Sequence, residues 1–236
     1  METAYKYILA IHVACGFVAL LTGLIAIFAK KGKPFHTRVG VIYYWGMFGV
    51  FVTTLVLFSL KPTKPVLQFF LMVAVASFYQ TFTGRRTLGR KKAGSQPTWP
   101  DWLALGVVVV FGLGTLGFSV YTALKGNWFM GTLYTGFTWV CLSSGWQDWR
   151  LYTGRTKPEK GGWLILHIMR MMSSYAATVT AFMVNISGRL PENTPQWAYL
   201  AAWILPGVLI GGIGIRRYVR IWRAKFNPSP KAVAVA

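Results

Sequence analysis

The chain has 236 residues, of which 54% are hydrophobic and only 13% are charged, whereas an average soluble domain has about 25% charged residues. Its mean hydropathy of +0.46 leaves too little polar surface to cover a water-soluble globule of this length, which excludes a soluble enzyme. Lysine and arginine outnumber aspartate and glutamate by 25 to 5, for a net charge of +20. The basic residues stand in short clusters between apolar runs, so we expect a protein embedded in a lipid bilayer and no nucleic-acid partner.

Seven apolar runs are long enough to cross a hydrocarbon core of about 30 Å, which needs about 20 helical residues. Aromatic residues lie near their ends, as in interfacial belts. The runs are Tyr5–Ala29, Val39–Leu60, Pro65–Gly84, Trp102–Leu124, Trp128–Trp146, Trp163–Ile186 and Trp197–Val219. The sequence therefore predicts an all-α, polytopic transmembrane helical bundle with seven spans. We expect one domain over residues 1–224 and an irregular cytoplasmic tail over residues 225–236.

Basic residues are divided unequally between alternate loops. Nineteen lysines and arginines fall on one side, five fall on the other, and Arg170 lies within a span. Because positively charged loops stay in the cytoplasm, this division places the N-terminus outside and the C-terminus in the cytoplasm, in agreement with an odd number of spans. We expect a multi-pass protein of the bacterial inner membrane, with loops too short to hold an inserted soluble domain.

The cysteines and acidic residues exclude several kinds of site. Cys15 and Cys141 both fall in apolar runs, so neither a disulfide framework nor a thiolate zinc site is expected. Asp101 and Asp148 stand at the cytoplasmic ends of spans and Glu159 in a loop. No carboxylate is expected in the middle of a span, and no strong internal repeat is present, which together disfavour a cation-coupled transporter.

The three histidines are the first candidates for chemistry, because ionisable residues are costly inside a membrane. His12 begins a stripe of small residues at helical spacing, formed by Gly16, Ala19 and Gly23. Such a stripe lets another helix or a flat cofactor approach closely. Helix packing and cofactor binding are both open for His12.

His36 and His167 are predicted to lie at the same, cytoplasmic level of the second and sixth spans. Tyr43 continues the helical face of His36, and Arg170 lies one turn deeper than His167. We therefore expect a site at the cytoplasmic rim in which these four residues bind a cofactor, with the two histidines as ligands only if a haem or another metal is bound. Arg170 could instead snorkel back to the headgroups, or point into the bundle toward an acceptor such as Asp148.

Two strings carry a resemblance to a known family. They are H-x-x-x-G-x-x-Y from His36 to Tyr43 and H-x-x-x-M-x-x-S-Y-A from His167 to Ala176. Over its first two spans and its sixth, the chain resembles a family of predicted bacterial membrane proteins catalogued as domain of unknown function 2306. The resemblance singles out His12, His36, Gly40, Tyr43, His167, Met171, Ser174, Tyr175 and Ala176. It implies a membrane architecture and no particular reaction.

The depth of each histidine in the membrane limits which of them can bind the same metal ion. His12 and His167 are separated vertically by roughly 14 Å at about 1.5 Å of rise per residue, so they cannot share one iron, and only His36 with His167 could. The same gap disfavours a metal-dependent hydrolase that uses all three.

Three functions stay open at this point. The first is a non-catalytic accessory subunit of a membrane protein complex or a small-molecule binding protein. The second is an electron-transfer protein that binds a b-type haem or a quinone at the cytoplasmic rim. The third is a small-solute transporter. Whether the protein is an enzyme is open as well.

Overall fold

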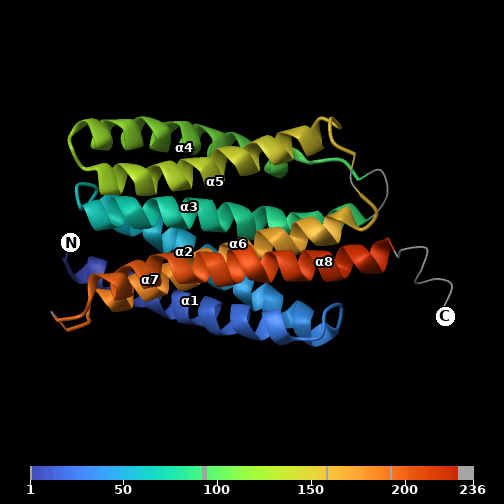
Figure 1. Ribbon diagram of the computed structural model, residues 1–236, viewed down its shortest axis with the longest axis horizontal. Coiled ribbons are helices and arrows are strands. Elements are labelled where there is room, and N and C mark those ends of the chain that lie inside the picture. The colour runs from blue at the N-terminus through green and yellow to red at the C-terminus, as the bar shows by residue number, and fades with distance from the viewer. Residues whose placement is uncertain (1, 92–94, 158, 192, 228–236) are drawn as a thin grey trace.

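The helices lie side by side along the long axis of the computed structural model (Figure 1). The structure describes residues 2–91, 95–157, 159–191 and 193–227. Within them every regular element is helical, in the order α1 (Glu2–Phe28), α2 (Pro34–Leu60), α3 (Pro65–Arg86), η1 (Thr87–Lys91), α4 (Trp99–Leu124), α5 (Trp128–Tyr152), α6 (Gly162–Ser187), α7 (Gln196–Pro206), η2 (Gly207–Gly214) and α8 (Ile215–Phe226). The all-α prediction is confirmed.

The helix starts follow from local chemistry. Pro34, Pro65 and Pro100 each occupy the first turn of a helix, where a missing backbone N–H leaves no hydrogen bond unmade. At the start of α4, the Asp101 carboxylate accepts hydrogen bonds from the Thr98 backbone N–H at 2.8 Å and from its hydroxyl at 3.0 Å. These contacts satisfy donors that the first turn would otherwise leave unpaired.

The last rod is one continuous helix of mixed geometry. The segment Gly207–Gly214 is a π-helix that joins α7 to α8 without a break. Pro206 lies inside the helix and has no N–H to donate, and four glycines follow it within eight residues, so the regular α-helical hydrogen-bond pattern is weakened here. The rod reaches Phe226, so Lys225 and Phe226 of the expected tail are helical, while residues 228–236 lie outside the described residues.

The rods divide into neighbouring groups around α3. α1 packs on α2, α4 packs on α5, and α3 contacts α2, α4, α5 and α6. α6 also contacts α1 and the whole length of the α7–η2–α8 rod (Figure 1). Small residues permit the closest of these approaches: a Cβ at Gly46 of α2 would lie 3.3 Å from the backbone of Cys15 in α1.

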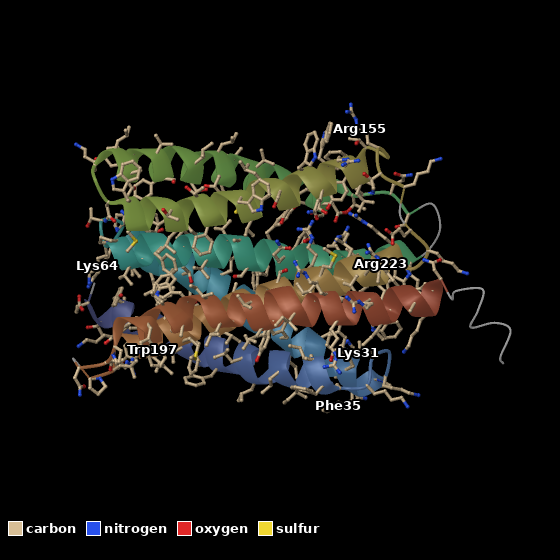
Figure 2. The ribbon with its side chains drawn as sticks, in the orientation of Figure 1. Lys31, Phe35, Lys64, Arg155, Trp197 and Arg223 are labelled. Carbon is tan, nitrogen blue, oxygen red and sulfur yellow. The ribbon has the colours of Figure 1, made fainter. Side chains whose placement is uncertain are left out.

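One end of the bundle, here called the basic end, holds the α1–α2, α3–α4 and α5–α6 connections together with α8. Figure 2 shows Lys31, Arg155 and Arg223 toward this end, and Lys64 and Trp197 toward the other. The described residues of the four basic clusters are thus gathered at one end.

Within the part of the chain that the structure describes, five helical stretches are long and apolar enough to cross a membrane. They are α1, α2, the α3–η1 stretch, α4, and Trp197–Phe226 of the last rod. α5 and α6 have comparable lengths of 25 and 26 residues and run beside the others (Figure 1), but they carry more polar side chains. The structure therefore supports a multi-pass membrane protein.

The fifth helix is longer than the apolar run that predicted it. Asp148 lies inside α5, because this helix continues six residues beyond the Trp146 at which the apolar run ends. Its side chain is only 2% exposed. The polar tail of the run stays helical because its polar groups find partners on α3 and α6, which hydropathy alone does not register.

Candidate functional site

A cavity of about 300 Å³ lies at the basic end between α1, α2, α6 and α8, beside the end of α3. We call it the histidine cavity. Its aromatic lining consists of Tyr43, Tyr44, Trp163, Tyr175, Tyr218 and Trp222. Its basic lining consists of Lys31, His36, Arg85 and His167. None of its lining residues is acidic, so the cavity combines an apolar, aromatic wall with a positive potential.

The two histidines are held in the same way. Nδ1 of His36 lies 3.1 Å from the Ala26 carbonyl oxygen of α1, and Nδ1 of His167 lies 2.8 Å from the Gly84 carbonyl oxygen of α3. A carbonyl can only accept, so in each ring Nδ1 carries the hydrogen and the neutral imidazole has its lone pair on Nε2. Neither Nε2 has a hydrogen-bond partner among the described residues. Two oriented acceptors therefore border one cavity.

The convergence of His36 and His167 agrees with their shared level in the sequence. They come from α2 and α6, which the fold brings together at the basic end, and both line the same cavity. The backbone of α1 orients the ring of His36, and the backbone of α3 orients the ring of His167. The positions of the two rings therefore depend on the packing of four helices. Backbone carbonyls orient the histidine ligands of metals in the same manner.

Lys31 is a lining residue that sequence reasoning did not single out. Its ammonium donates to the carbonyl oxygens of Ala26 and Ile27, each at 2.6 Å, and so caps the C-terminus of α1. Burial lowers the pKa of this ammonium below its ordinary value. A lysine shortly after the end of an apolar run is the signal that could have found it, because such a side chain can fold back onto the last carbonyls.

Arg85 is the second cation at the cavity. Its guanidinium lies 4.4 Å from the centre of the Tyr44 ring, a cation–π distance. Arg85 is exposed, so it joins the cavity to the surface of the basic end.

The ring of Tyr43 lines the cavity while its hydroxyl faces the bundle. The hydroxyl lies 2.9 Å from Ser174 Oγ, which in turn lies 2.5 Å from Thr81 Oγ1. All three side chains are buried. This hydroxyl chain connects α2, α6 and α3, and it fixes the wall of the cavity rather than offering Tyr43 as a free donor.

Arg170 is 3% exposed and points into the bundle, away from the histidine cavity, which it does not line. Its guanidinium donates to Asp148 Oδ1 at 3.0 Å, to Gln80 Oε1 at 2.9 Å and to the Ser144 carbonyl at 3.3 Å. The Tyr79 hydroxyl donates to the other oxygen of Asp148 at 2.5 Å. The carboxylate of Asp148 is thus the charged acceptor that the fold supplies for an inward-facing Arg170.

His12 lies in α1, away from the other two histidines. Its Nδ1 is 2.9 Å from Thr53 Oγ1 and 3.4 Å from Thr54 Oγ1 of α2. Of its stripe of small residues, Ala19 and Gly23 are buried, and Gly23 faces the Tyr175 ring. The described surroundings of His12 are thus a helix–helix contact.

Among the described residues, no group of three or more His, Cys, Asp or Glu could hold a metal ion. His36 and His167 are the residues of the histidine cavity that could ligate a metal or a haem iron. Asp148 and Asp101 are buried but paired with Arg170 and Arg86 respectively. Both carboxylates therefore already have a guanidinium partner.

Comparison with known proteins gives no relative. No family model, no curated protein and no solved structure matches this chain.

Proposed function

We propose that this protein binds, within the membrane, a small amphiphilic molecule whose ring carries carbonyl or hydroxyl oxygens, the chemistry of a quinone or quinol. The observation that carries the proposal is the pair of Nδ1-anchored imidazoles, from α2 and α6, that border one aromatic cavity. Its volume of about 300 Å³ stands at the lower end of the range for small-molecule sites, about 300–1000 Å³.

The lining can form hydrogen bonds with both the reduced (quinol) and the oxidised (quinone) form of such a ring. The lone pair on Nε2 of His36 or His167 can accept a hydrogen bond from a quinol hydroxyl, while Arg85 can donate to a quinone carbonyl. The rings of Trp163 and Trp222 offer flat apolar faces for the ring of the ligand. Binding alone needs no redox partner, so the protein can act as a carrier or sensor of the ligand.

A b-type haem is the second candidate, because two neutral imidazoles with hydrogen-bonded Nδ1 are suited to coordinate one iron through Nε2. The modest volume of the cavity favours a single ring over a four-ring porphyrin. The absorbance of the purified protein separates the two, since haem has an intense band in the visible and near-ultraviolet that a quinone lacks.

We further propose that all seven rods cross the membrane of a bacterium, with the basic end in the cytoplasm. α5 and α6 can span because their polar side chains face each other and α3, where Asp148 and Arg170 neutralise one another. The excess of lysine and arginine at the basic end supports this orientation. Membership of the family of unknown function, docking to a larger membrane complex and solute transport stay predictions from the sequence.

The full chain is purified in detergent and titrated with decylubiquinone, a short-tailed quinone that serves as the probe. Quinones quench tryptophan fluorescence, and Trp163 and Trp222 line the cavity. A Cβ at Gly40, another lining residue, would meet no heavy atom within 4 Å, so a larger side chain there grows into open space. Gly40→Leu should abolish saturable quenching. Gly106→Leu on α4 is the matched control, because a Cβ there also meets nothing within 4 Å, and it should leave the saturable quenching unchanged.

His167→Ala should weaken decylubiquinone binding about tenfold, the loss of one hydrogen bond worth about 1.4 kcal/mol, whereas His12→Ala should leave it unchanged. Equal binding by the wild type and Gly40→Leu would refute the proposed site. A haem absorbance band that disappears in His36→Ala and His167→Ala would replace the quinone proposal by the haem alternative.

A further inference from the structure

A second cavity, of about 720 Å³, lies at the basic end on another side of α6. We call it the cationic cavity. It is bounded by η1, the last turn of α5, the α5–α6 connection, the first turns of α6, and Arg223 of α8. Among the described residues, only Trp163 lines both cavities, so α6 separates the two. The proposed quinone site does not use the cationic cavity.

Positive charge exceeds negative charge in this cavity. Its charged lining residues are Arg90, Lys91, Lys157, Glu159 and Arg223. Two of the cations have a carboxylate partner: Arg223 pairs with Glu159 at 3.3 Å, and Arg90 lies 3.7 Å from Asp101. Lys91 and Lys157 have no carboxylate partner among the described residues, and both are exposed. Two ammonium groups therefore carry uncompensated charge at the rim.

The remaining lining divides into an apolar part and a polar part. Leu151, Ile165, Leu166 and Met169 come from the facing sides of α5 and α6 and provide the apolar part. Thr87, Ser95, Gln96, Gln147 and Thr156 provide hydroxyl and amide groups near the cations. An occupant must therefore combine an anionic, hydrogen-bonding head with an apolar portion.

We propose that the cationic cavity binds the phosphate head of an anionic phospholipid, such as phosphatidylglycerol, with part of its acyl chains against the apolar wall. Basic pockets between membrane helices on the cytoplasmic side are suited to such heads, because that leaflet carries anionic lipid. Lys91 and Lys157 supply the charge that the phosphate neutralises, and Arg90 is already held beside the cavity by its stacking on Tyr152 at 4.4 Å. The basic surface of α8 lies at the same end, next to the site.

The same phosphate chemistry could come from a soluble anion, so the experiment has two arms. In the first, delipidated full-length protein in neutral detergent is titrated with phosphatidylglycerol or with phosphatidylcholine of the same acyl chains. In the second, it is titrated with glycerol 1-phosphate. Native mass spectrometry counts the bound molecules, and thermal unfolding reports stabilisation. We expect phosphatidylglycerol to bind at least tenfold more tightly than phosphatidylcholine.

The variant Lys91→Glu/Lys157→Glu reverses the two uncompensated charges at exposed positions, so it should unfold at the wild-type temperature without lipid. It should lose the preference for phosphatidylglycerol. The matched control Lys30→Glu/Lys33→Glu makes the same change of charge at exposed positions of the basic end, outside the cavity, and should keep the preference.

Stabilisation by glycerol 1-phosphate alone, lost in the cavity variant and kept in the control, would support a phosphate site with a soluble ligand. Equal loss in both double variants would refute the site, because the preference would then come from net charge. Unchanged binding by the cavity variant would refute it as well.

Discussion

Replacing Arg170 by methionine removes a buried cation and leaves a similar apolar volume. The Asp148 carboxylate, 2% exposed, would then keep the Tyr79 hydroxyl as its only side-chain donor. The variant loses two well-placed hydrogen bonds from the guanidinium, at 3.0 Å to Asp148 and at 2.9 Å to Gln80. Hydrogen bonds to charged groups contribute about 1.5–3 kcal/mol each, so we expect a loss of about 3–5 kcal/mol, the range seen when one partner of a buried ion pair is removed.

The assay is thermal unfolding in detergent. For a chain of this length 1 kcal/mol corresponds to about 2–4 °C in Tm, so Arg170→Met should lower Tm by about 6–20 °C. Arg150 lies two residues from Asp148 on the same helix but is exposed, and Arg150→Met should change stability by no more than about 0.5 kcal/mol. The second charge of the pair gives a further check. Arg170→Met/Asp148→Asn should be more stable than Arg170→Met alone, because no unpaired charge stays buried.

Equal Tm values for Arg170→Met and Arg150→Met would contradict a stabilising ion pair at Arg170. Arg170 would then extend to the headgroup region, and its ion pair with Asp148 would contribute nothing to stability. Additive effects of Arg170→Met and Asp148→Asn in the double variant would also contradict the ion pair. Groups in direct contact should show a coupling energy of about 0.5–3 kcal/mol. Folded Arg170→Met should still bind decylubiquinone, because Arg170 does not line the histidine cavity.

Three further predictions concern orientation, packing and pH. A cysteine at Lys33 should react with a membrane-impermeant thiol reagent only after the cytoplasmic face is opened, and one at Lys125 should react in intact cells; the reverse pattern would invert the topology. Gly23→Ala should lower stability by about 1–3 kcal/mol in thermal unfolding, because the new Cβ collides with the Tyr175 ring, and an unchanged Tm would mean that the ring moves freely. Burial lowers the pKa of Lys31, so the folded state releases this proton at lower pH than the unfolded state, and stability should rise with pH between the folded-state and unfolded-state pKa values. The stability of Lys31→Met should lack this rise with pH. Identical pH profiles of stability for the wild type and Lys31→Met would contradict the prediction.

The sequence alone determined where the helices lie along the chain. Each predicted run agrees with a rod of the structure, because proline, glycine and charge mark the ends of apolar stretches about as long as a membrane is thick. The alternation of basic and neutral loops also predicted His36 and His167 at the same level, and in the structure both line one cavity. These features depend only on distance along the chain.

The tertiary structure decided which side chains meet across the bundle. A helix such as α1 or α2 is apolar on nearly every side, so its sequence does not encode its rotation about its axis or its neighbours. The partner of Arg170 depends on the axial register of α5 against α6 and on the extension of α5 past its apolar run. Both cavities likewise exist only because α6 lies between α3 and the last rod, and hydropathy contains no information on that arrangement.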